Sequence, residues 1–443
     1  MFNLSQGASV AINALNAAGY EAYAVGGAIR DTIMGRAVND FDVTTNATPE
    51  QMKAVFSDMR IIETGIKHGT LTLLHDGETV EITTYRIDGE YADNRHPESV
   101  SFTSELSEDL SRRDFTINAL AYDPISDTLV DLFDGVADIE NKQIRAIGDP
   151  KRRFSEDALR ILRAIRFASV LEFDIEERTR EAMRECIPLL ASISRERIAV
   201  ELNKLLCGKG VKRAILENVD ILSAILPEIG VMNGFDQKNS WHIYDVLTHT
   251  AVAVESIEPE PHLRLMAFLH DIGKAHTFSL DERGVGHFYG HNGVSAERAR
   301  QFFNEYKYDN LTKDRVCNII ALHDTHIEED KIYIKKRMNR MGKEAFFDLL
   351  KLQKADNLAQ NPEKVNMAHF DIVKSIADKI IEEESCFSLK DLAVNGTDLI
   401  ENGFEKGKKL GEILAFLLNE VIEERIPNEK IMLLKKAKEQ FGG

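Results

Sequence analysis

The spacing of hydrophobic and polar positions changes near residue 150 of this chain. Before that point, short apolar runs alternate with Gly, Asp and Asn, which is typical of strands joined by turns. Residues 23–25 and 40–44 are predicted to form two strands, and residues 70–74 and 80–85 are predicted to form a hairpin. After residue 150, apolar residues recur every three and four positions while Pro and Gly become sparse, which indicates helices. The pattern therefore predicts an α/β head followed by an all-helical body.

The composition is that of a globular protein. Of the 443 residues, 43% are hydrophobic and 29% are charged, and the length allows two to four domains. No run of about 18 apolar residues is present, so no membrane span is expected. The first residues lack the basic region and apolar core of a secretion signal. The four cysteines have no metal-like spacing, so we expect buried thiols and a cytoplasmic location.

The net charge of −18 comes from 55 Lys and Arg residues against 73 Asp and Glu residues. This balance argues against a protein that coats nucleic acid through its bulk charge, but it leaves room for a local basic groove. Basic islands occur at 335–343 and 430–438. For each island alone, a solvated helix face is the simpler interpretation.

Two glycines, an arginine and two aspartates follow the first predicted strand. The glycine pair that ends at Gly27 lets backbone N–H groups approach a phosphate, and Arg30 adds a fork of donors. Asp40 and Asp42, at i and i+2 on a predicted strand, point to one side and suit a hard divalent ion such as Mg²⁺. Each feature alone is commonly structural. Together, in this order, they indicate metal-assisted transfer of a nucleotide.

The segment 110–119 carries two adjacent arginines followed by Asp114. One arginine, such as Arg113, can face a triphosphate while Asp114 orients the other. The alternative interpretation is a surface ion pair, which contributes little to stability.

A third polar group lies on the predicted helix that begins at Ser155. We expect Ser155 to be its N-cap, with Asp157 in the first turn. Asp157 and Arg160 are three residues apart, and such a pair can read a base, because Asp accepts from an exocyclic amine and Arg donates to ring atoms. Arg163 and Arg166 wind away from Asp157, so they are expected to meet phosphates, primer or protein. An ordinary amphipathic helix with ion pairs is the alternative.

These motifs together resemble the class II tRNA nucleotidyltransferases, the bacterial CCA-adding enzymes within the polymerase-β-like superfamily. The resemblance covers roughly residues 15–230, in the order GGAIRD, DFD, RRDFTINALA and EDALRILRAIRF. It implies a polymerase-β-like head followed by an all-α neck, body and tail in a hook-shaped arrangement. The implied parts are a head at 1–145, a neck with the base template at 146–230, a body at 231–360 and a tRNA-binding tail at 361–443.

The resemblance also implies a role for each residue. Asp40 and Asp42 would hold two Mg²⁺ ions, and Gly27, Arg30 and Arg113 would bind the incoming nucleotide and its triphosphate. Asp157 and Arg160 would be the amino-acid template that selects C and then A, with Arg163 and Arg166 in the same nucleotide site. The implied substrates are CTP, ATP and the 3′ end of tRNA, joined by two-metal in-line displacement with release of pyrophosphate.

Relatives with other activities leave an alternative open. The resemblance places a flexible loop at 86–97, which relatives that add only CC lack. Relatives that add only A, and poly(A) polymerases, keep a similar loop, so A addition alone or polyadenylation remains the alternative. Glu81, on a following predicted strand, is the candidate for a third acidic residue.

A separate signature lies between residues 241 and 357 and resembles the HD metal-dependent phosphohydrolases. An adjacent His-Asp pair can ligate metal from one helix end, with a His and an Asp supplied by other helices. The predicted ligands, for Mg²⁺ or a transition metal, are His249, His270, Asp271 and Asp356. His291 and His323 match the extended form that binds two metals. A phosphohydrolase activity is therefore the second alternative function.

Overall fold

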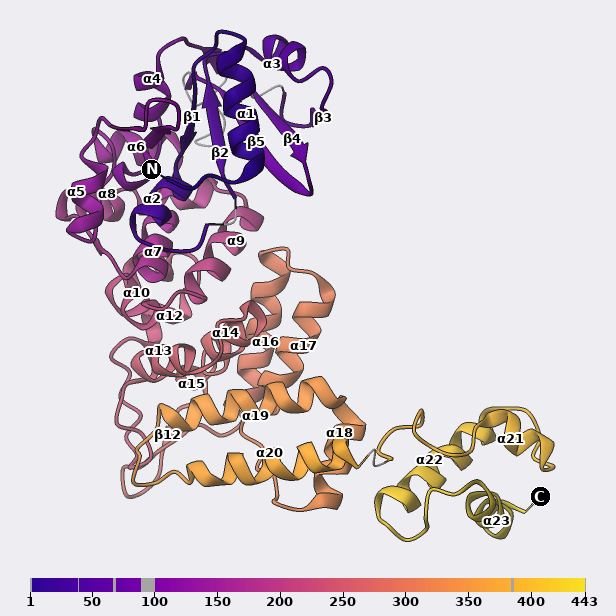
Figure 1. The fold of residues 1–443 in the computed structure, drawn as a ribbon. Coiled ribbons are helices and arrows are strands. Elements are labelled where there is room, and N and C mark those ends of the chain that lie inside the picture. The colour runs from indigo at the N-terminus through magenta and orange to yellow at the C-terminus, as the bar shows by residue number, and fades with distance from the viewer. Residues whose placement is uncertain (1, 39, 67–68, 89–99, 384–385, 443) are drawn as a thin grey trace. The chain divides into compact units, whose positions relative to one another are not determined.

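The computed structural model describes residues 2–38, 40–66, 69–88, 100–383 and 386–442. It divides the chain into two compact units, Met1–Gly230 and Val231–Gly443. The first unit contains a seven-stranded sheet and helices, and the second is mostly helical (Figure 1). The change from mixed to helical structure predicted by the sequence pattern is confirmed. None of the helices in the described ranges combines the length and apolar character that a membrane crossing requires.

The sheet of the first unit has the strand order β3-β4-β5-β2-β1-β8-β9. Strands β1 and β2 are antiparallel, whereas β2 and β5 run parallel. The strands of this sheet are β1 (Ala22–Val25), β2 (Asp42–Thr45), β3 (Arg60–Ile62), β4 (Thr70–His75), β5 (Glu78–Thr84), β8 (Leu120–Asp123) and β9 (Thr128–Asp131). Shorter pairs are formed by β6 (Arg86–Asp88) with β7 (Val100–Phe102), β10 (Gln143–Ile144) with β11 (Asp174–Ile175), and β12 (Ser279–Leu280) with β13 (Gly286–His287).

One face of the sheet is covered by α1 (Gln6–Ala17), which packs against β1, β2, β4 and β5 (Figure 1). Its buried residues Ala8, Ala11, Ile12 and Leu15 follow the spacing of one helix face. Their side chains are fully buried, so this helix anchors the central strands that lead to the site.

The strand predicted at 40–44 begins two residues later, at Asp42. Strand β2 pairs with β1 from Thr45 opposite Ala22 to Asp42 opposite Val25, and β1 ends there because the chain turns at Gly26. Asp40 precedes β2 and is exposed. The expectation that Asp40 lies on the strand is therefore wrong, because the neighbouring strand is too short to pair with it.

The predicted hairpin is confirmed as β4 and β5. Its turn is tighter than expected, because only Asp76 and Gly77 lie outside the strands, with φ of +46° and +84°. Two consecutive positive φ angles are typical of the type I′ turn that fits strand twist. The loop predicted at 86–97 starts in β6, and its residues 89–97 lie outside the described residues.

Helices and short 3₁₀ helices lie between the strands and then continue as far as residue 232. They are α2 (Gly27–Ile33), α3 (Pro49–Val55), α4 (Leu106–Ser111), η2 (Thr116–Asn118), α5 (Gly135–Glu140), α6 (Pro150–Glu156), α7 (Leu159–Leu171), α8 (Glu177–Glu185), η3 (Ile187–Ser192), α9 (Arg195–Leu206), α10 (Val211–Glu217), α11 (Val219–Ser223) and α12 (Glu228–Met232). Helices α7 and α9 pack closely on each other.

Asp157 lies between helices α6 and α7 and not in the first turn of one helix. The predicted N-cap, Ser155, lies inside α6, and its hydroxyl donates to a backbone oxygen one turn earlier at 2.8 Å. This prediction is wrong because a stronger start signal precedes it: Asp149 caps α6 and Pro150 occupies its first position. The Asp157 side chain instead accepts the N–H of the first residue of α7 at 3.1 Å.

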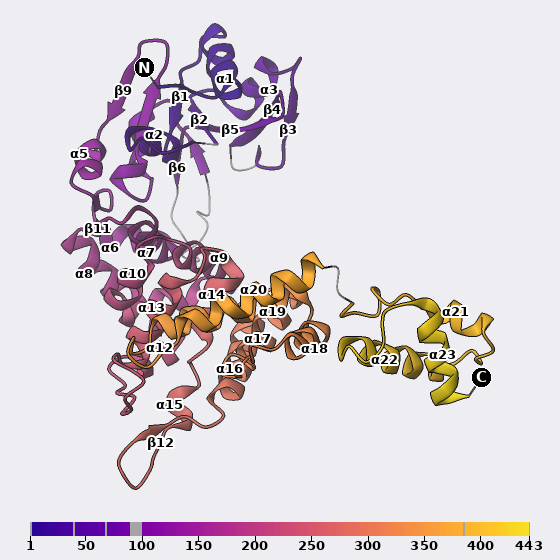
Figure 2. The same cartoon turned by 60° about the horizontal axis from the view of Figure 1, so that its bottom comes forward.

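The second unit consists mainly of packed helices (Figures 1 and 2). Helix α13 packs against α14 and α19, and α17 packs against α14 and α16. The helices are α13 (Val246–Ser256), α14 (Pro261–Leu269), α15 (Lys274–Thr277), α16 (His291–Glu305), α17 (Asn310–Ile320), α18 (Lys331–Met341), α19 (Lys343–Leu358), α20 (Met367–Glu382), α21 (Gly396–Glu401), α22 (Lys408–Ile422) and α23 (Lys430–Phe441).

The two basic islands differ in their surroundings. In the first, Lys335 is buried and donates to Glu424 at 3.0 Å, so this lysine is not part of a solvated face. In the second, Lys436 pairs with Glu420 at 3.5 Å, on the face that joins α23 to α22. The four cysteines are free thiols; Cys207 is half-buried and the other three are buried.

Candidate functional site

The first part of the site is the turn after β1. Gly26 has φ of +77°, and a Cβ on this residue would lie 3.1 Å from Nη1 of Arg113, so a larger side chain would be both strained and crowded. Gly27 then begins α2, which carries Arg30. The Arg30 guanidinium is buried, and it donates to Oδ1 of Asn118 at 2.6 Å and to Asp31 at 2.8 Å. The turn therefore places backbone N–H groups beside two fixed guanidinium groups.

Asp42 lies at the start of β2, directly opposite the last residue of β1. Strand β5 runs parallel to β2, and its Ile82 pairs with Val43. Glu81 and Asp42 are the residues immediately before this pair, each on its own strand. The two carboxylates consequently lie side by side on one face. Although Asp42 is exposed at the surface, the protein around its carboxylate partly excludes water. This desolvation, and then the negative charge of Glu81, raise the pKa of Asp42 above its ordinary value. A cation at this position would relieve that repulsion.

Asp40 contributes less to this cluster than the sequence predicted. Its charge also raises the pKa of Asp42, but by less than desolvation and Glu81 do, which shows that the two aspartates are neighbours. Exposure does not separate the three carboxylates, because Asp40, Asp42 and Glu81 are all exposed. Glu81 is therefore at least as well placed beside Asp42 as Asp40 is.

The adjacent arginines Arg112 and Arg113 are held by Asp109, a residue that the sequence analysis did not select. Asp109 is fully buried and accepts from Arg112 at 2.7 Å and from Arg113 at 3.3 Å. Burial alone would raise the pKa of Asp109, but the charges of the two arginines lower it below its ordinary value. The expectation that Asp114 orients one of these arginines is wrong.

Asp114 instead binds helix α7. Its carboxylate accepts from Nε of Arg163 at 2.8 Å and from Nη2 at 2.5 Å, and it also accepts from Nδ2 of Asn118 at 2.9 Å. Although burial opposes it, the Arg163 charge lowers the pKa of Asp114 to about 2. Because Asn118 also accepts from Arg30, a continuous polar chain connects α2, the segment at 114–118 and α7.

Asp157 and Arg160, the residues predicted to read the base, do not bind each other. Asp157 accepts from Nη2 of Arg197, on α9, at 2.7 Å. Arg160 donates to Glu156 at 2.9 Å and to the backbone oxygen of Arg112 at 3.0 Å. Both side chains are thus held in place by neighbours, and neither neutralises the other.

Arg166 contacts other side chains of the protein, which is one of the alternatives expected for it. Its Nε lies 3.1 Å from Oε2 of Glu201 on α9, and its guanidinium lies 4.0 Å from the ring centre of Phe167. Burial lowers the pKa of Arg166, and Glu201 opposes that effect.

A cavity of about 510 Å³ brings these side chains together. Asp40 is not among the residues that line it. Seven arginines line it, because Arg112 and Arg197 add to the five predicted ones, against three aspartates. Asp31, Asp109, Glu156 and Glu201 pair with several of these arginines from outside the lining, but the guanidinium groups themselves face the cavity and suit a polyanion such as a triphosphate. The predicted residues in its lining are Gly27, Arg30, Asp42, Arg113, Asp157, Arg160, Arg163 and Arg166.

Several contributors were missed because their sequence signals are weak. Arg197 and Glu201 occupy i and i+4 on α9, which is an ordinary surface pattern, and only tertiary packing on α7 gives them a role. Asn118 lies within the quoted RRDFTINALA motif, so its position in the site was available as a signal.

The second predicted site is a buried cluster in the second unit. Two groups of side chains have ligand atoms within 4.8 Å of one another, and Asp271 belongs to both. Its Oδ2 lies 3.2 Å from His270 and 3.4 Å from His249, while its Oδ1 lies 3.5 Å from His291 and 3.9 Å from His323. The first group consists of His249, His270, Asp271 and Asp356, and the second consists of Asp271, His291 and His323.

All four histidines present the same nitrogen to the centre of the cluster. Each Nδ1 lies 2.7–3.1 Å from a backbone carbonyl, which accepts a hydrogen bond but cannot donate one. In the neutral rings, Nε2 therefore carries the lone pair. Nε2 of His291 faces Nε2 of His323 at 3.1 Å. A carbonyl behind each imidazole is the arrangement that orients metal ligands.

The polar atoms at the centre of this cluster are incompletely satisfied within the described residues. Oδ1 of Asp271 and Nε2 of His270 have no hydrogen-bond partner, although both residues are buried. Burial alone would raise the pKa of Asp271, but the charges of His270 and then Lys274 lower it well below its ordinary value. Burial lowers the pKa of His323 to about 3. Burial opposes a charge on His270, but Asp271 and then Asp356 raise the pKa of His270 to about 10, so this imidazole would release a proton when it binds a metal ion. An ionised carboxylate and imidazole nitrogens are metal ligands, so the donor set fits one or two metal ions.

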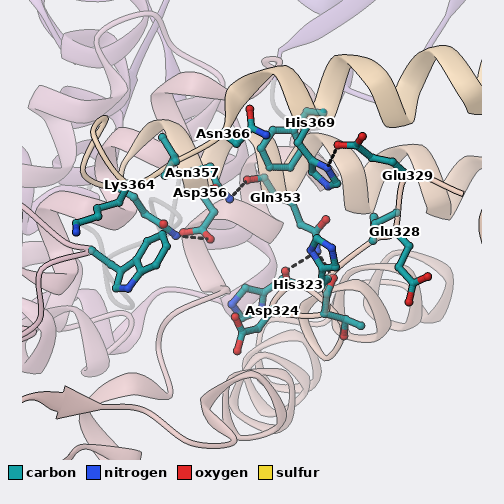
Figure 3. A pocket seen from close by; sticks show the side chains of 17 residues that line it. His323, Asp324, Glu328, Glu329, Gln353, Asp356, Asn357, Lys364, Asn366 and His369 are labelled. Carbon is teal, nitrogen blue, oxygen red and sulfur yellow. Dashed lines mark hydrogen bonds and ion pairs between the residues drawn. The ribbon is translucent and has the colours of Figure 1, made fainter.

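A cavity of about 660 Å³ opens beside the cluster (Figure 3). His323, Asp324 and Asp356 lie on its wall, and Gln353 donates to the backbone oxygen of His323 at 2.8 Å. On the opposite side, His369 is paired with Glu329 at 2.7 Å. The cluster is therefore reachable from a cavity large enough for a small ligand.

Comparison with known proteins gives matches along most of the chain. Residues 22–145 match the family described as the poly A polymerase head domain. Residues 172–232 match a probable RNA- and SrmB-binding site of polymerase A, and residues 282–437 match a putative domain 2 of tRNA nucleotidyltransferase.

Relatives and solved structures cover nearly the whole length. The CCA-adding enzyme of Streptococcus pyogenes serotype M2 is 33% identical over 93% of this chain and 91% of its own. That of Lactobacillus helveticus is 33% identical over 94% and 92%. The crystal structure of the Bacillus stearothermophilus CCA-adding enzyme in complex with CTP has a TM-score of 0.73 at 30% identity, and the match covers 98% and 97% of the two chains. The chain therefore belongs to the family of CCA-adding enzymes, which are tRNA nucleotidyltransferases.

Proposed function

We propose that this chain completes the 3′ end of tRNA by adding C, C and A from CTP and ATP, with release of pyrophosphate. The observation that supports it most is the arginine-rich cavity that Asp42 also lines. Its seven arginines suit a triphosphate, and a carboxylate at the same wall suits the metal ion that accompanies one.

The carboxylates at the start of β2 would hold the metal ions. Asp42, with Asp40 before it and Glu81 beside it, forms an all-oxygen donor set of the kind that Mg²⁺ prefers. Two ions bound there would lower the pKa of the attacking 3′-hydroxyl and stabilise the leaving pyrophosphate. Arg30 and Arg113 are held near the glycine turn before substrate arrives, so they can stabilise developing charge on the phosphates without reorganising.

In this proposal, Asp157 and Arg160 select the base of the incoming nucleotide. An ionised carboxylate accepts from the exocyclic amine of C or A, and a guanidinium donates to ring acceptors. Arg197 and Glu156 hold these two side chains from behind, which fixes the geometry in which they meet a base. The same two residues would reject U and G, because those bases present the opposite pattern at the amine position.

A substrate test separates this activity from A addition and polyadenylation. The protein is incubated with tRNA that lacks its last three nucleotides, first with CTP alone and then with CTP and ATP. The proposal predicts addition of two C residues in the first case and of CCA in the second. No addition from CTP alone, or a long A tail, would contradict it.

A variant test addresses the role of Asp42. Asp42→Ala should abolish addition of both nucleotides while leaving tRNA binding nearly intact, because the carboxylate acts on metal and not on the tRNA body. Asp58→Ala, an exposed aspartate elsewhere in the head, is the matched control and should keep full activity. Incorporation retained by Asp42→Ala would rule out the metal assignment.

A second candidate function is supported by the cluster around Asp271. Four imidazoles oriented by carbonyls surround the shared carboxylate of Asp271, and Asp356 adds a second carboxylate to one of the two groups. These ligands suit a transition metal or Mg²⁺, and the donor set fits a metal-dependent phosphohydrolase. Metal analysis of the purified protein should find bound metal. His270→Ala should lose it, and His276→Ala, an exposed histidine six residues further on, should keep it. Equal metal content in wild type and His270→Ala would refute the site.

A further inference from the structure

Phe167 is an aromatic residue in the lining of the arginine-rich cavity of the first unit. It lies on α7, directly after Arg166, and is 7% exposed. The guanidinium carbons of three arginines lie over its ring, at 4.0 Å from the ring centre for Arg166, 5.2 Å for Arg30 and 5.6 Å for Arg163. All three arginines line the same cavity, so one ring contacts three of its seven arginines.

The Phe167 ring is itself fixed by packing. It meets the fully buried ring of Phe115 nearly at a right angle, with centroids 5.8 Å apart and planes at 83°. Phe115 directly follows Asp114, whose carboxylate accepts from Arg163 on α7. The aromatic contact and this ion pair therefore join the same two segments of the chain, and the ring has a defined place among the cations around it.

The ring differs from the polar partners that the three arginines also have. These partners of Arg30, Arg163 and Arg166 are, in that order, Asn118, Asp114 and Glu201. A polar partner occupies N–H donors of the guanidinium group, and a carboxylate also offsets its charge. An aromatic ring attracts the positive charge through its quadrupole and needs no particular N–H donor. It therefore stabilises cations that lie close together and leaves more of their donors to a ligand.

Arg166 shows this effect of the ring most clearly. Its guanidinium carbon lies nearest to the ring centre, and its buried Nε has no hydrogen-bond partner within the described part of the chain. The contact of this nitrogen with Glu201 at 3.1 Å is an ion pair without the alignment of a hydrogen bond. Because no hydrogen bond fixes Nε, the contact with Phe167 contributes to the position of this guanidinium group.

We infer that Phe167 is a positioning residue for the triphosphate: its ring holds three guanidinium groups in place while N–H donors remain available to phosphate oxygens. This inference rests on the proposed function, in which the cavity binds the phosphates of CTP and ATP. Charged donors that are fixed before the ligand arrives bind it more tightly, because less conformational freedom is lost on binding. If Phe167 were only a core residue, its shape would matter and the charge distribution of its ring would not.

Fluorination of the ring separates its charge distribution from its packing. Fluorine atoms withdraw electron density from the face of the ring and nearly preserve its shape, which weakens the attraction to a cation. In the full-length protein, Phe167 is replaced by a trifluorinated phenylalanine, and inorganic pyrophosphate is titrated calorimetrically in the presence of Mg²⁺. The affinity for pyrophosphate should fall by about tenfold, since several partly desolvated cation–π contacts are weakened together.

The same replacement at Phe173 is the matched control. Phe173 is 2% exposed in the same unit and is not among the residues that line the cavity, so pyrophosphate affinity should stay at the wild-type value. Phe167→Leu removes the ring altogether and should weaken pyrophosphate binding at least as much as fluorination does, whereas Phe173→Leu should not.

Steady-state kinetics separate an effect on the phosphates from an effect on the base. In the protein fluorinated at Phe167, KM for CTP and KM for ATP should rise by the same factor. The ratio of kcat/KM for CTP to that for UTP should stay unchanged, because the ring acts through arginines that bind phosphate. A changed ratio together with an unchanged affinity for pyrophosphate would overturn the inference.

The outcomes distinguish this inference from the proposed function. Wild-type affinity for pyrophosphate in the protein fluorinated at Phe167 would overturn the positioning role, even if the protein adds CCA to tRNA. A loss of affinity in that protein, but not in the Phe173 control, would support the positioning role even if wild type adds no C to tRNA, in which case the proposed function fails. Wild type that does not bind pyrophosphate at all would overturn both.

Discussion

Replacement of Asp114 by Asn is a sensitive test of how the first unit holds helix α7. The substitution keeps the size of the side chain but removes the charge that binds Nε and Nη2 of Arg163 at 2.8 and 2.5 Å. Asp114 is 8% exposed and the Arg163 side chain is 33% exposed. The amide of the variant would face Arg163 either with its N–H₂ group or with its oxygen. The guanidinium cannot accept a hydrogen bond from the N–H₂ group, and the amide oxygen is a weaker acceptor than a carboxylate.

The expected loss of stability is about 2 kcal/mol. Removing one partner of a fully buried ion pair costs about 3–5 kcal/mol, and the partial exposure of Arg163 reduces this value. The pKa of Asp114 gives a consistent magnitude. A drop from an ordinary value of 3.8 to about 2 corresponds to about 2 kcal/mol of differential stabilisation of the ionised form.

Urea unfolding of Asp114→Asn and wild type at pH 7 is the measurement. Asp58→Asn is the exposed control, and the cycle with Arg163→Met should reveal a coupling energy of about 1–2 kcal/mol. Because the folded pKa of Asp114 is depressed, its contribution is present above pH 4 and is lost as the pH falls toward 2. The difference in the free energy of unfolding between wild type and variant should therefore become smaller as the pH falls from 4 toward 2. Equal urea midpoints at pH 7 would refute the reasoning.

Three further predictions concern single residues. Gly135→Ala should destabilise the protein by about 2–3 kcal/mol, seen as a lower Tm, because its Cβ would lie 2.4 Å from the backbone oxygen of Thr116. Arg197→Met should reduce the preference for CTP over UTP in kcat/KM by about tenfold, since Asp157 loses its fixed partner; an unchanged ratio would contradict this. Glu81→Gln should raise the Mg²⁺ concentration for half-maximal activity by up to about tenfold, as a charge beside Asp42 is lost, and an unchanged Mg²⁺ titration would exclude Glu81 from the metal site.

Much of the fold followed from hydrophobic spacing and turn residues. The strand before Gly26 and the hairpin of β4 and β5 are confirmed, because both depend on local patterns that are complete within a few residues. The change to helices near residue 150 is confirmed for the same reason. The four-part division, the cytoplasmic location and the roles of the site residues stay predictions.

The remaining features depended on tertiary contacts that a sequence does not display. The start of β2 at Asp42 is set by the length of its neighbour β1, and the break at Asp157 follows from a cap that starts the previous helix earlier. Spacing within one helix suggested that Asp157 faces Arg160. The structure shows that Arg197, forty residues away, is its partner. Asp109 was missed because its role depends on burial below the two arginines.

For the histidine cluster, in contrast, the spacing in the sequence identified residues that lie together in the structure. The ligand spacing in the sequence selected His249, His270, Asp271 and Asp356, and the structure brings all four together from separate helices and their ends. His291 and His323, which matched only the extended pattern, complete a second group through Asp271. The sequence did not show that backbone carbonyls fix every ring, since that depends on the exact ends of the helices.

The assignment of the nucleotide site is best tested by a structure of the protein with CTP and Mg²⁺ bound. We expect the triphosphate to lie between the glycine turn and Arg113, with metal at Asp42, and the cytosine ring to contact Asp157 and Arg160. CTP bound away from the arginine-rich cavity, or with its base turned from both Asp157 and Arg160, would rule this assignment out.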